Sequence, residues 1–389
     1  MSDLTSDVVV IGAGVIGSSI AFHLVKRGMS VVLVDKNEPA GETSGACDGL
    51  IFCQSKKPGT HLKMAMESKK IFDSLVGELP FDMELEHTGG LVTIESEAEY
   101  KAMSQYVQQQ KSAGLDVSLI DGKQAREIEP ALADSIVGAA YSPIDSQINP
   151  LTLNLGLAFG AKQRGATLLM REPVIDVLCD NGQVVGVKTS KRTISSNIVI
   201  NAAGIYAPEI AKMVGLTVPI KPRRGQLLIT EPIPKLLKTC MISASYIAQK
   251  FDPSLAEAGA KAVSIEQTKT GSLLLGSSRE FVGFDRSTTP DAISRIAGNA
   301  ARVIPELKKR QIVRVMAGLR PYTPDGLPIL GHVENIKGFI MAAGHEGDGI
   351  ALSAITGDLI SQLAVDNQTD ISLDEFALSR FEVAPQGVL

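Results

Sequence analysis

Three glycines at the spacing G-x-G-x-x-G, Gly12, Gly14 and Gly17, stand between an apolar run and a stretch with helical periodicity. The apolar run, residues 7–11, is typical of a parallel strand that is buried on both faces. Gly12 allows a tight turn, Gly14 lets the backbone approach a pyrophosphate, and Gly17 lets the following helix lie close to the strand. The pattern therefore predicts a dinucleotide site with its phosphates at a helix N-terminus.

An acidic residue completes this unit. A second apolar run, residues 30–34, ends at Asp35, about 20 residues after the glycines, where a carboxylate accepts a hydrogen bond from a ribose hydroxyl. Val15, Ile16 and Lys36 flank these positions, and we expect them to contact the same ligand. The first 35 residues thus predict a complete β-α-β nucleotide-binding unit.

A stretch rich in small and hydroxyl-bearing residues, 41–46, follows the second predicted strand. Thr43, Ser44 and Ala46, with the adjacent Cys47, are placed to meet a second length of phosphate and the edge of a flavin ring. This stretch favours FAD over NAD, which the glycine pattern alone does not distinguish. A surface turn before a helix is the alternative interpretation.

Composition limits the function classes. With 389 residues the chain exceeds what one hydrophobic core normally serves, so two domains are expected. The net charge of -5 provides no general positive field for nucleic acid or an anionic membrane. Aromatic residues make up only 4%, and Trp is absent, which argues against a base-stacking surface.

Targeting and metal signals are weak. The first residues lead directly into the run at 7–11, so no cleavable signal segment is expected. No apolar run approaches the ~18 residues that span a bilayer, which leaves at most peripheral membrane association.

The cysteines lack the paired spacing of metal sites or iron–sulfur clusters, so no metal is expected. They are Cys47, Cys53, Cys179 and Cys240. Scattered thiols indicate a reducing, cytoplasmic location.

Two kinds of strand arrangement alternate along the chain. Hairpins are predicted at 83–94, around Thr88-Gly89-Gly90, and at 174–189, around Asn181-Gly182. Residues 222–320 indicate antiparallel strands, one of them at 242–249. Helices are predicted at 61–79, 96–113, 149–165, 291–303 and 350–365. Because parallel and antiparallel parts alternate, we expect an α/β protein whose two domains are interleaved in sequence.

Six segments together resemble the DAO family of FAD enzymes, the group of D-amino-acid oxidase, glycine oxidase and sarcosine oxidase. They are VVVIGAGVIGSSIAFHL at 8–24, ETSGA at 42–46, VINAAGIYAPEIA at 199–211, PRRGQLLIT at 222–230, MAGLRPYTPDGLPILG at 316–331 and MAAGHEGDGIALSAITGDLI at 341–360. The resemblance covers nearly the whole chain, in the family's order.

This resemblance implies a fold and a division of the chain. A Rossmann-like FAD-binding domain of the glutathione-reductase type is expected from residues 1–80, 144–216 and 321–389. Residues 81–143 and 217–320 are expected to form a substrate domain, an α+β unit around an antiparallel sheet.

The resemblance also assigns cofactor contacts beyond the glycine-rich unit. Val174 matches the position whose backbone meets adenine, and Ala203 and Gly204 end a strand beside the phosphates. The loop and strand that edge the flavin ring correspond to Arg224, Gly225 and Gln226. At the start of the last predicted helix, the residues expected to face the flavin are Gly347, Asp348, Gly349 and Ile350.

Substrate contacts follow from the same comparison. Arg320 matches the arginine that binds the substrate carboxylate, a role that suits a planar and permanently charged guanidinium. Glu346 and Tyr246 are further substrate-binding candidates, and His345 is a candidate to hydrogen-bond flavin or substrate. For the two acids, Glu346 and Asp348, three roles remain open: binding a cationic substrate group, balancing Arg320, or capping the helix.

Flavin attachment is expected to differ from that of some relatives. Monomeric sarcosine oxidase relatives carry a cysteine that bonds the flavin covalently, whereas the aligned residue here is Gly318. The resemblance therefore implies non-covalent FAD.

The implied activity is oxidation of the C–N bond of a small amino acid or secondary amine by hydride transfer to flavin N5. The sequences around 45–52 and 346–348 look closer to β-type subunits of proline, hydroxyproline or opine dehydrogenases, which pass electrons to partner subunits with further redox centres. An oxygen-using oxidase and a non-catalytic flavin-binding subunit remain alternatives. An oxygen-activating lysine is not clearly placed, and Lys269 is the nearest guess.

Overall fold

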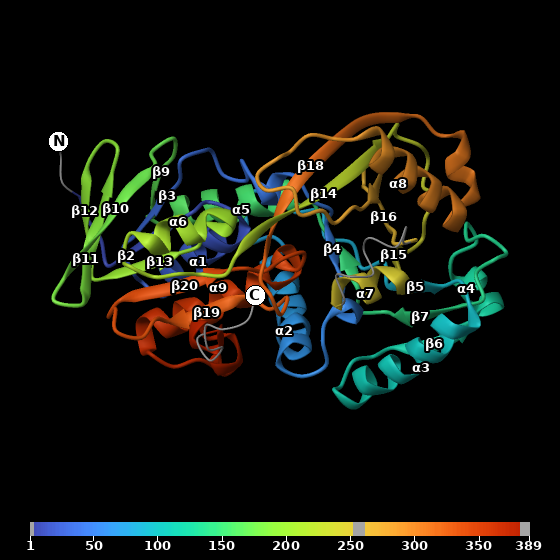
Figure 1. Ribbon diagram of the computed structural model, residues 1–389, viewed down its shortest axis with the longest axis horizontal. Helices are drawn as coiled ribbons and strands as arrows, with labels where there is room; N and C mark the ends of the chain where they lie inside the picture. The colour runs from blue at the N-terminus through green and yellow to red at the C-terminus, as the bar shows by residue number, and fades with distance from the viewer. Residues whose placement is uncertain (1–3, 252–260, 382–389) are drawn as a thin grey trace, which may run out of the picture.

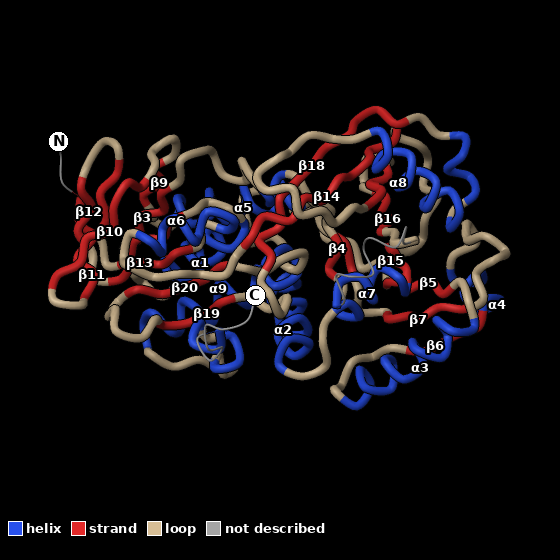
Figure 2. The backbone as a smooth tube through the Cα atoms, in the orientation of Figure 1, coloured by secondary structure: helices blue, strands red, loops and turns tan. Residues whose placement is uncertain are grey.

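The computed structural model describes residues 4–251 and 261–381. The ends of the predicted FAD-binding domain, 1–3 and 382–389, and residues 252–260 of the predicted substrate domain lie outside the described residues. The molecule is elongated, with one large sheet in each half (Figure 1). In Figure 2 the strands form two groups, and helix α2 (Thr60–Leu75) lies between them.

A six-stranded sheet in the order β19-β20-β13-β2-β3-β9 forms the centre of the first half. Its strands are β2 (Val8–Ile11), β3 (Val31–Val34), β9 (Thr167–Leu169), β13 (Ile198–Asn201), β19 (Ile329–His332) and β20 (Phe339–Ala343). All neighbouring pairs are parallel except β19 with β20. The carboxyl ends of the five parallel strands therefore meet at one edge, where ligands bind in open α/β sheets.

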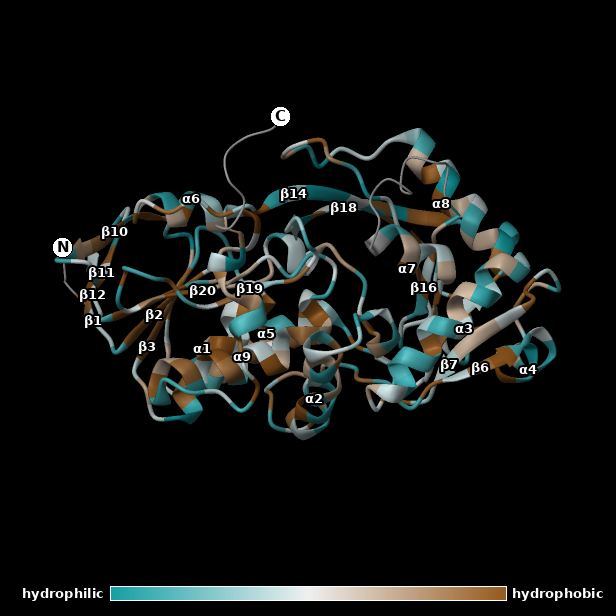
Figure 3. Cartoon of the chain, turned by 60° about the horizontal axis from the view of Figure 1, so that its bottom comes forward, coloured by the Kyte–Doolittle hydropathy of each residue, from teal (hydrophilic) through white to brown (hydrophobic). Residues whose placement is uncertain are grey.

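Both faces of this sheet are covered, which explains the uninterrupted apolar runs. Val8 and Val10 pack in the core formed with helices α1 (Val15–Lys26), α2, α5 (Pro150–Gln163) and α9 (Gly349–Asp366). Val9 and Ile11 face the opposite core, with helix α6 (Ala207–Lys212) and a four-stranded sheet. Figure 3 shows the hydrophobic colouring of these strands and of α1 and α9.

Two smaller sheets complete this part of the molecule. The four-stranded sheet has the order β1-β12-β11-β10, and the two-stranded sheet joins β4 to β8. Their strands are β1 (Leu4–Thr5), β4 (Leu50–Ile51), β8 (Ser146–Gln147), β10 (Val174–Asp180), β11 (Gln183–Thr189) and β12 (Thr193–Ser195). The β10–β11 pair is the hairpin predicted around Asn181-Gly182, and both turn residues have positive φ, as its sharp reversal requires.

An eight-stranded sheet in the order β18-β14-β17-β16-β15-β5-β7-β6 forms the second half. Its strands are β5 (Gly90–Ile94), β6 (Ser118–Asp121), β7 (Gly138–Ser142), β14 (Lys221–Thr230), β15 (Cys240–Ser243), β16 (Ser264–Gln267), β17 (Leu273–Gly276) and β18 (Ile312–Tyr322). Helices α3 (Glu97–Ser112), α4 (Gly122–Ile128), α7 (Ala244–Phe251) and α8 (Pro290–Val303) also belong to this half. The long β14–β18 pair leads from this sheet back to the centre of the molecule (Figure 1).

Two predicted elements were wrong. Residues 83–85 form no strand, because β5 pairs instead with β7 and, in parallel, with the distant β15. The strand predicted at 242–249 ends at Ser243, whose hydroxyl oxygen accepts the backbone N–H of Tyr246 and so starts α7. This side-chain cap favours a helix over a continued strand.

The chain passes repeatedly between the two large sheets, as interleaving requires. The six-stranded sheet takes strands from 8–34, 167–201 and 329–343, and the eight-stranded sheet from 90–142, 221–276 and 312–322. The domain boundaries themselves stay a prediction. In the described part of the chain, no helix is both long and apolar enough to cross a bilayer.

Candidate active site

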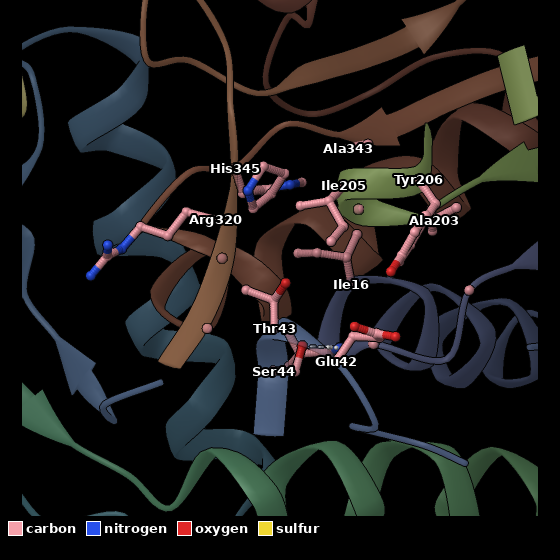
Figure 4. Close-up of a pocket in the computed structure, with 18 of the residues that line it drawn as sticks. Ile16, Glu42, Thr43, Ser44, Ala203, Ile205, Tyr206, Arg320, Ala343 and His345 are labelled. Carbon is pink, nitrogen blue, oxygen red and sulfur yellow. Dashed lines mark hydrogen bonds between the residues drawn. The ribbon is translucent and has the colours of Figure 1, made fainter. Parts of the chain in front are cut away.

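An elongated cavity lies at the carboxyl edge of the parallel sheet and reaches the β14–β18 pair. Its lining includes the residues that end β2, β3 and β20, namely Ile11, Val34 and Ala343. In Figure 4 the labelled residues surround a central space, with Arg320 at one end and Glu42 and Tyr206 at the other. One cavity thus joins the glycine-rich unit to the predicted substrate arginine.

The glycine-rich turn is built as its spacing predicts. Gly12 has φ +109°, and a Cβ there would lie 2.5 Å from the carbonyl oxygen of Ala202. A Cβ on Gly17 would lie 1.8 Å from the Gly12 oxygen, so only glycine lets α1 approach β2 this closely. Gly14 precedes α1 and has no side chain to cap it; Ser44 Oγ takes the N–H of Val15, and the other N–H groups of the first turn are left for an anion.

Asp35 lies at the nucleotide end of the cavity. Its carboxylate accepts the N–H groups of Ala13 and Asn37, both at 2.6 Å. Burial raises the pKa of Asp35, although these two hydrogen bonds oppose the shift. The adjacent Lys36 places its Nζ 3.1 Å from the centroid of the Tyr206 ring, a cation–π contact that also lines the cavity.

The hydroxyl-rich stretch connects the two halves of the cavity. It forms a short 3-10 helix, Thr43–Gly45. Ser44 Oγ accepts the N–H of Val15 at 3.0 Å, and Thr43 Oγ1 donates to the Leu319 carbonyl of β18 at 2.6 Å. The segment therefore fixes the start of α1 relative to the strand that carries Arg320.

Arg320 is half-buried and lies across the backbone of Gly225. Its Nη1 donates to the Ser278 carbonyl at 3.0 Å, and its Nη2 donates to Ser277 Oγ at 3.2 Å. A Cβ on Gly225 would lie 2.1 Å from Nη1, so glycine is required beneath this guanidinium. Among the described residues no carboxylate forms a salt bridge with Arg320.

The two acids that precede α9 have cationic protein partners. Glu346 forms an ion pair with Arg223 and accepts a hydrogen bond from Gly347 N–H. Asp348 pairs with Lys56 Nζ at 2.9 Å, and its second oxygen lies 3.3 Å from His61 Nε2. Glu346 therefore balances Arg223 rather than Arg320.

Capping of α9 by Asp348 is excluded by the same geometry. Asp348 occupies the N-cap position, but its side chain accepts no hydrogen bond from the helix. Its carboxylate instead points to Lys56 and His61. The N–H groups at the start of α9 are thus left facing the cavity, which Gly349 and Ile350 line.

His345 is buried at the cavity wall. Its Nε2 lies 3.2 Å from Thr356 Oγ1 within the α9 segment. Burial lowers the pKa of His345 to about 3, although the nearby Asp348 carboxylate opposes the shift. The imidazole is therefore neutral at physiological pH and serves as a hydrogen-bonding group rather than a cation.

A carboxyl pair, a half-buried Asp48 and a buried Glu266, adjoins Arg320, and sequence reasoning missed it. Asp48 lines the cavity, and its Oδ2 accepts a hydrogen bond from Ser264 Oγ at 3.3 Å. Burial raises the pKa of Asp48, and the charge of Arg320 opposes this. Glu266 accepts the Gly49 N–H at 2.9 Å, and burial together with the nearby Asp48 raises its pKa strongly.

Most of the predicted contacts line this one cavity. They are Gly12, Gly14, Val15, Ile16, Asp35, Lys36, Thr43, Ser44, Ala46, Cys47, Val174, Ala203, Gly204, Gly225, Tyr246, Arg320, His345, Glu346, Gly347, Gly349 and Ile350. Four predicted contacts lie outside its lining: Gly17, Arg224, Gln226 and Asp348.

These four have other structural partners. Arg224 pairs with Glu280 and Asp285, because alternate residues of β14 point to opposite sides of the sheet. The Gln226 amide hydrogen-bonds Glu280 and Thr289. Gly17 packs against Gly12, and Asp348 belongs to the ion pair with Lys56. The side chains of Arg224 and Gln226 therefore make structural contacts in the second half, and their contact with the flavin stays a prediction.

One lining residue carried a signal in the sequence that was not used. Asp48 is an acid within an otherwise apolar stretch, Cys47 to Cys53. Because removing a carboxyl from water is costly, an acid in such a stretch indicates a polar group with a specific role.

Lys269 was the guessed oxygen-activating lysine. It is exposed and pairs with Asp82 outside the main cavity, so that guess was wrong.

Comparison with known proteins shows the family and its cofactor. The model of a family described as FAD dependent oxidoreductase, DAO, matches residues 7–363. The chain belongs to this family. The predicted family and the predicted FAD cofactor are both confirmed.

Individual relatives match over the full length. Hydrogen cyanide synthase subunit HcnC of Pseudomonas aeruginosa is 30% identical, over 99% of this chain and 98% of that protein. Glycine oxidase of Geobacillus kaustophilus is 30% identical, over 96% and 97%. The solved structure of L-proline dehydrogenase from P. horikoshii superposes with a TM-score of 0.90 at 27% identity, over 98% and 99%. These matches also confirm the predicted fold class.

The residues of the cavity fit FAD. Because Gly12 and Gly14 have no side chains, a pyrophosphate can come close to the backbone there. The N–H groups at the start of α1 suit its negative charge. Asp35 is placed for a ribose hydroxyl, and the start of α9 suits negative charge on a reduced ring. A Cβ on Gly318 would lie 2.5 Å from the Ala46 carbonyl oxygen, so the wall at this position has no room for a cysteine.

Proposed function

We propose that this protein oxidises the C–N bond of a small amino acid or secondary amine as an FAD-dependent dehydrogenase. The observation that carries the proposal is the guanidinium of Arg320. It lies in the wall of the FAD cavity, held by one hydroxyl and one carbonyl, and no described carboxylate forms a salt bridge with it. A substrate carboxylate is its natural partner, because a guanidinium binds a carboxylate through two parallel hydrogen bonds.

Orientation is the main task of the protein in this reaction. FAD supplies the hydride acceptor when it is bound. Arg320 fixes the substrate carboxylate, and the wall residues Ala46, Leu227 and Tyr246 narrow the space left for water around the substrate. Fixing one end of a small amino acid leaves its amine and α-carbon few positions, which lowers the entropic part of the barrier.

Asp48 is the side chain that we assign to the substrate proton. A substrate ammonium must lose a proton before its α-C–H bond gives up hydride, and Asp48 is the carboxyl in the lining beside Arg320. Because the pKa of Asp48 is raised, it lies closer to the pH at which the enzyme works, and a general base is most effective when the two are close. Glu266, next to Asp48, can share the proton.

Replacing this carboxyl gives a test. Asp48→Asn should lower kcat/KM by 10²–10⁴-fold, the usual contribution of such a group, and move the rise of the pH profile toward the pKa of the substrate amine. Equal pH profiles for the two proteins would exclude Asp48 as the base.

Electron transfer to a partner or carrier, rather than to oxygen, is part of the proposal. Lys36 is the one lysine in the described cavity lining, and its Nζ lies over the ring of Tyr206, which Figure 4 shows at the opposite end of the cavity from Arg320. The matched HcnC is named as a subunit, and the matched L-proline dehydrogenase as a dehydrogenase, which supports this choice. We further propose partner chains that carry additional redox centres, and a cytoplasmic location.

The decisive experiment compares two electron acceptors. The purified holoenzyme is screened with D- and L-proline, hydroxyproline, sarcosine, glycine and opines, with dye reduction and hydrogen peroxide measured in parallel. A dye rate much higher than the peroxide rate supports the dehydrogenase. Peroxide formed as fast as dye is reduced would make the protein an oxidase, and no turnover with any of these substrates would favour a flavin-binding subunit without activity.

A further inference from the structure

A second, smaller cavity adjoins the substrate end of the main one. It has a volume of about 200 Å³, and Ser44 and Cys47 line both cavities. Asp48 lines the main cavity and not the second, whereas Glu266 lines the second and not the main one. The second cavity reaches the molecular surface, because the exposed Lys269 is part of its lining. The two carboxyl groups therefore stand between the main cavity and a second path to solvent.

One face of β16 connects the two cavities. Ser264 and Glu266 point to the same side, because side chains alternate along a strand. Ser264 Oγ donates to Asp48 Oδ2 at 3.3 Å. Both carboxylate oxygens of Glu266 accept the N–H of Gly49, the residue after Asp48, at 2.9 and 3.0 Å. Thr268, two residues further along the chain, lines the second cavity. Polar side chains thus lead from Asp48 to that cavity.

The two carboxyl groups differ in how readily they hold a proton. Burial and the charge of Asp48 raise the pKa of Glu266 strongly. Burial also raises the pKa of Asp48, but the charge of Arg320 opposes that rise. Two neighbouring carboxyl groups do not both ionise readily. In the resting enzyme the proton therefore lies on Glu266, and Asp48 is a carboxylate that can accept another.

We propose that Glu266 transfers the substrate proton from Asp48 to water in the second cavity. The inference rests on the proposed function, since it takes Asp48 as the base. Each turnover moves one proton and no electrons along this path. Asp48 takes a proton from the substrate ammonium, and Glu266 releases the proton that it holds to water in the second cavity. The proton on Asp48 then passes to Glu266, which restores the resting state.

The surroundings of the pair favour this direction. A substrate held by Arg320 occupies the main cavity beside Asp48, so little water reaches the acid from that side. The second cavity contains further acceptors, since Glu84 and Glu86 line it and both are less buried than Glu266. A proton that leaves through the second cavity does not have to wait for the product to dissociate.

The experiment follows the proton and the flavin separately in a single turnover. Holoenzyme is mixed anaerobically with the amino acid that reduces it fastest, in weak buffer with a pH-indicator dye. In wild type, about one proton for each flavin should appear in step with flavin reduction. Glu266→Gln resembles the neutral resting side chain but has no proton to transfer. Its flavin reduction should stay within about threefold of wild type, while proton release becomes at least about tenfold slower than flavin reduction.

Two further variants assign the delay to the carboxyl group. Glu266→Asp restores a carboxyl that is one carbon shorter, so part of the lost proton-release rate should return and a smaller delay should remain. Glu129→Gln is the matched control. Glu129 is also buried and also accepts backbone N–H groups, from Lys238 at 2.6 Å and Thr239 at 3.0 Å, but it lines neither cavity. Its proton release should stay in step with flavin reduction.

The comparison of the two rates separates proton transfer from a structural role. Proton release that keeps pace with flavin reduction in Glu266→Gln would overturn the proposal, and so would a slowing of both rates by the same factor. If Glu266→Gln does not fold, Glu266→Asp decides the question, and the absence of any delay in it would reject the proposal. Failure of every amino acid to reduce wild-type flavin would reject the proposed function together with this transfer. Flavin reduction with an undelayed proton would reject the transfer alone.

Discussion

At the scale of single residues, the chemistry at the substrate end of the cavity depends on which charges are paired. Glu346 and Asp348 are neutralised by Arg223 and Lys56, so they stabilise the loop before α9 rather than attract a cation. Arg320 keeps only neutral hydrogen-bond partners. The guanidinium of Arg320 thus remains available to an anionic group of the substrate.

Removing the Arg320 guanidinium should reduce substrate binding without loss of FAD. Arg320→Leu is expected to lose about 2–5 kcal/mol of transition-state binding, the usual cost of breaking a buried charge pair. Arg314→Leu, an exposed residue of the same strand, is the control and should keep full activity. Unchanged kcat/KM in Arg320→Leu would refute the carboxylate assignment.

His345 predicts how stability changes with pH. Its folded pKa of about 3 lies below the ordinary 6.5, so the unfolded chain binds the proton more readily. The contribution to stability is full above pH 6.5 and is lost as pH falls toward 3, at up to about 1.4 kcal/mol per pH unit. Melting curves of holoenzyme should show a smaller loss between pH 7.5 and 5 for His345→Gln than for wild type. Parallel losses would contradict the assignment.

At the scale of elements, the β14–β18 pair positions the substrate residues. Gly225 and Gly318 lie opposite each other in its register. Gly225 leaves room for the Arg320 side chain, and Gly318 for the Ala46 carbonyl. The Thr43 hydroxyl ties β18 to the segment that starts α1. The strand register, together with glycine at positions 225 and 318, thus sets the width of the cavity.

A methyl group at Gly225 tests this arrangement. In Gly225→Ala the new Cβ would overlap the Arg320 guanidinium, a flexible group that can move, so the fold and FAD content should be retained. We expect kcat/KM to fall at least tenfold, because Arg320 is displaced from its two serine contacts. Gly298→Ala in α8, where the added methyl meets nothing within 4 Å, should leave activity intact and stabilise by about 0.5–1 kcal/mol. Full activity in Gly225→Ala would show that Arg320 does not depend on this glycine.

At the scale of the whole molecule, the cavity that fits FAD lies where the two halves meet. The cavity is lined from the six-stranded sheet by Ile11 and Ala343 and from the β14–β18 pair by Gly225 and Arg320. A ligand that contacts both halves of the folded chain stabilises it by mass action.

The mode of attachment is testable on the whole protein. Residue 318 is a glycine packed against the Ala46 carbonyl, so no cysteine is present there to bond the flavin. Acid precipitation should therefore release all of the yellow colour into the supernatant as FAD. The FAD-free protein should then melt at a lower temperature than holoenzyme, by an amount that grows with added FAD. Colour that stays in the pellet would demonstrate a covalent bond.

The sequence by itself determined the features whose parts are close together in the chain. The first 35 residues contain both strands, the helix, the glycines and Asp35, so local spacing and apolar runs were enough to predict the nucleotide unit. Longer motifs located Arg320, Thr43 and Ser44 in the right order. The family, FAD and the fold class followed from these segments and are confirmed.

Only the tertiary structure decided which distant groups meet. β5 pairs with β15, in which Cys240 lies opposite the distant Gly90, and Asp348 pairs with Lys56 near the other end of the chain. An acid can cap a helix, balance Arg320 or pair with another residue, and the cation that packs against it decides which. The spacing of residues in the sequence does not predict that cation. The same holds for Asp48. Its place in the cavity beside Arg320 arises from packing between two sheets, and the desolvation that raises its pKa turns an ordinary acid into a candidate for chemistry.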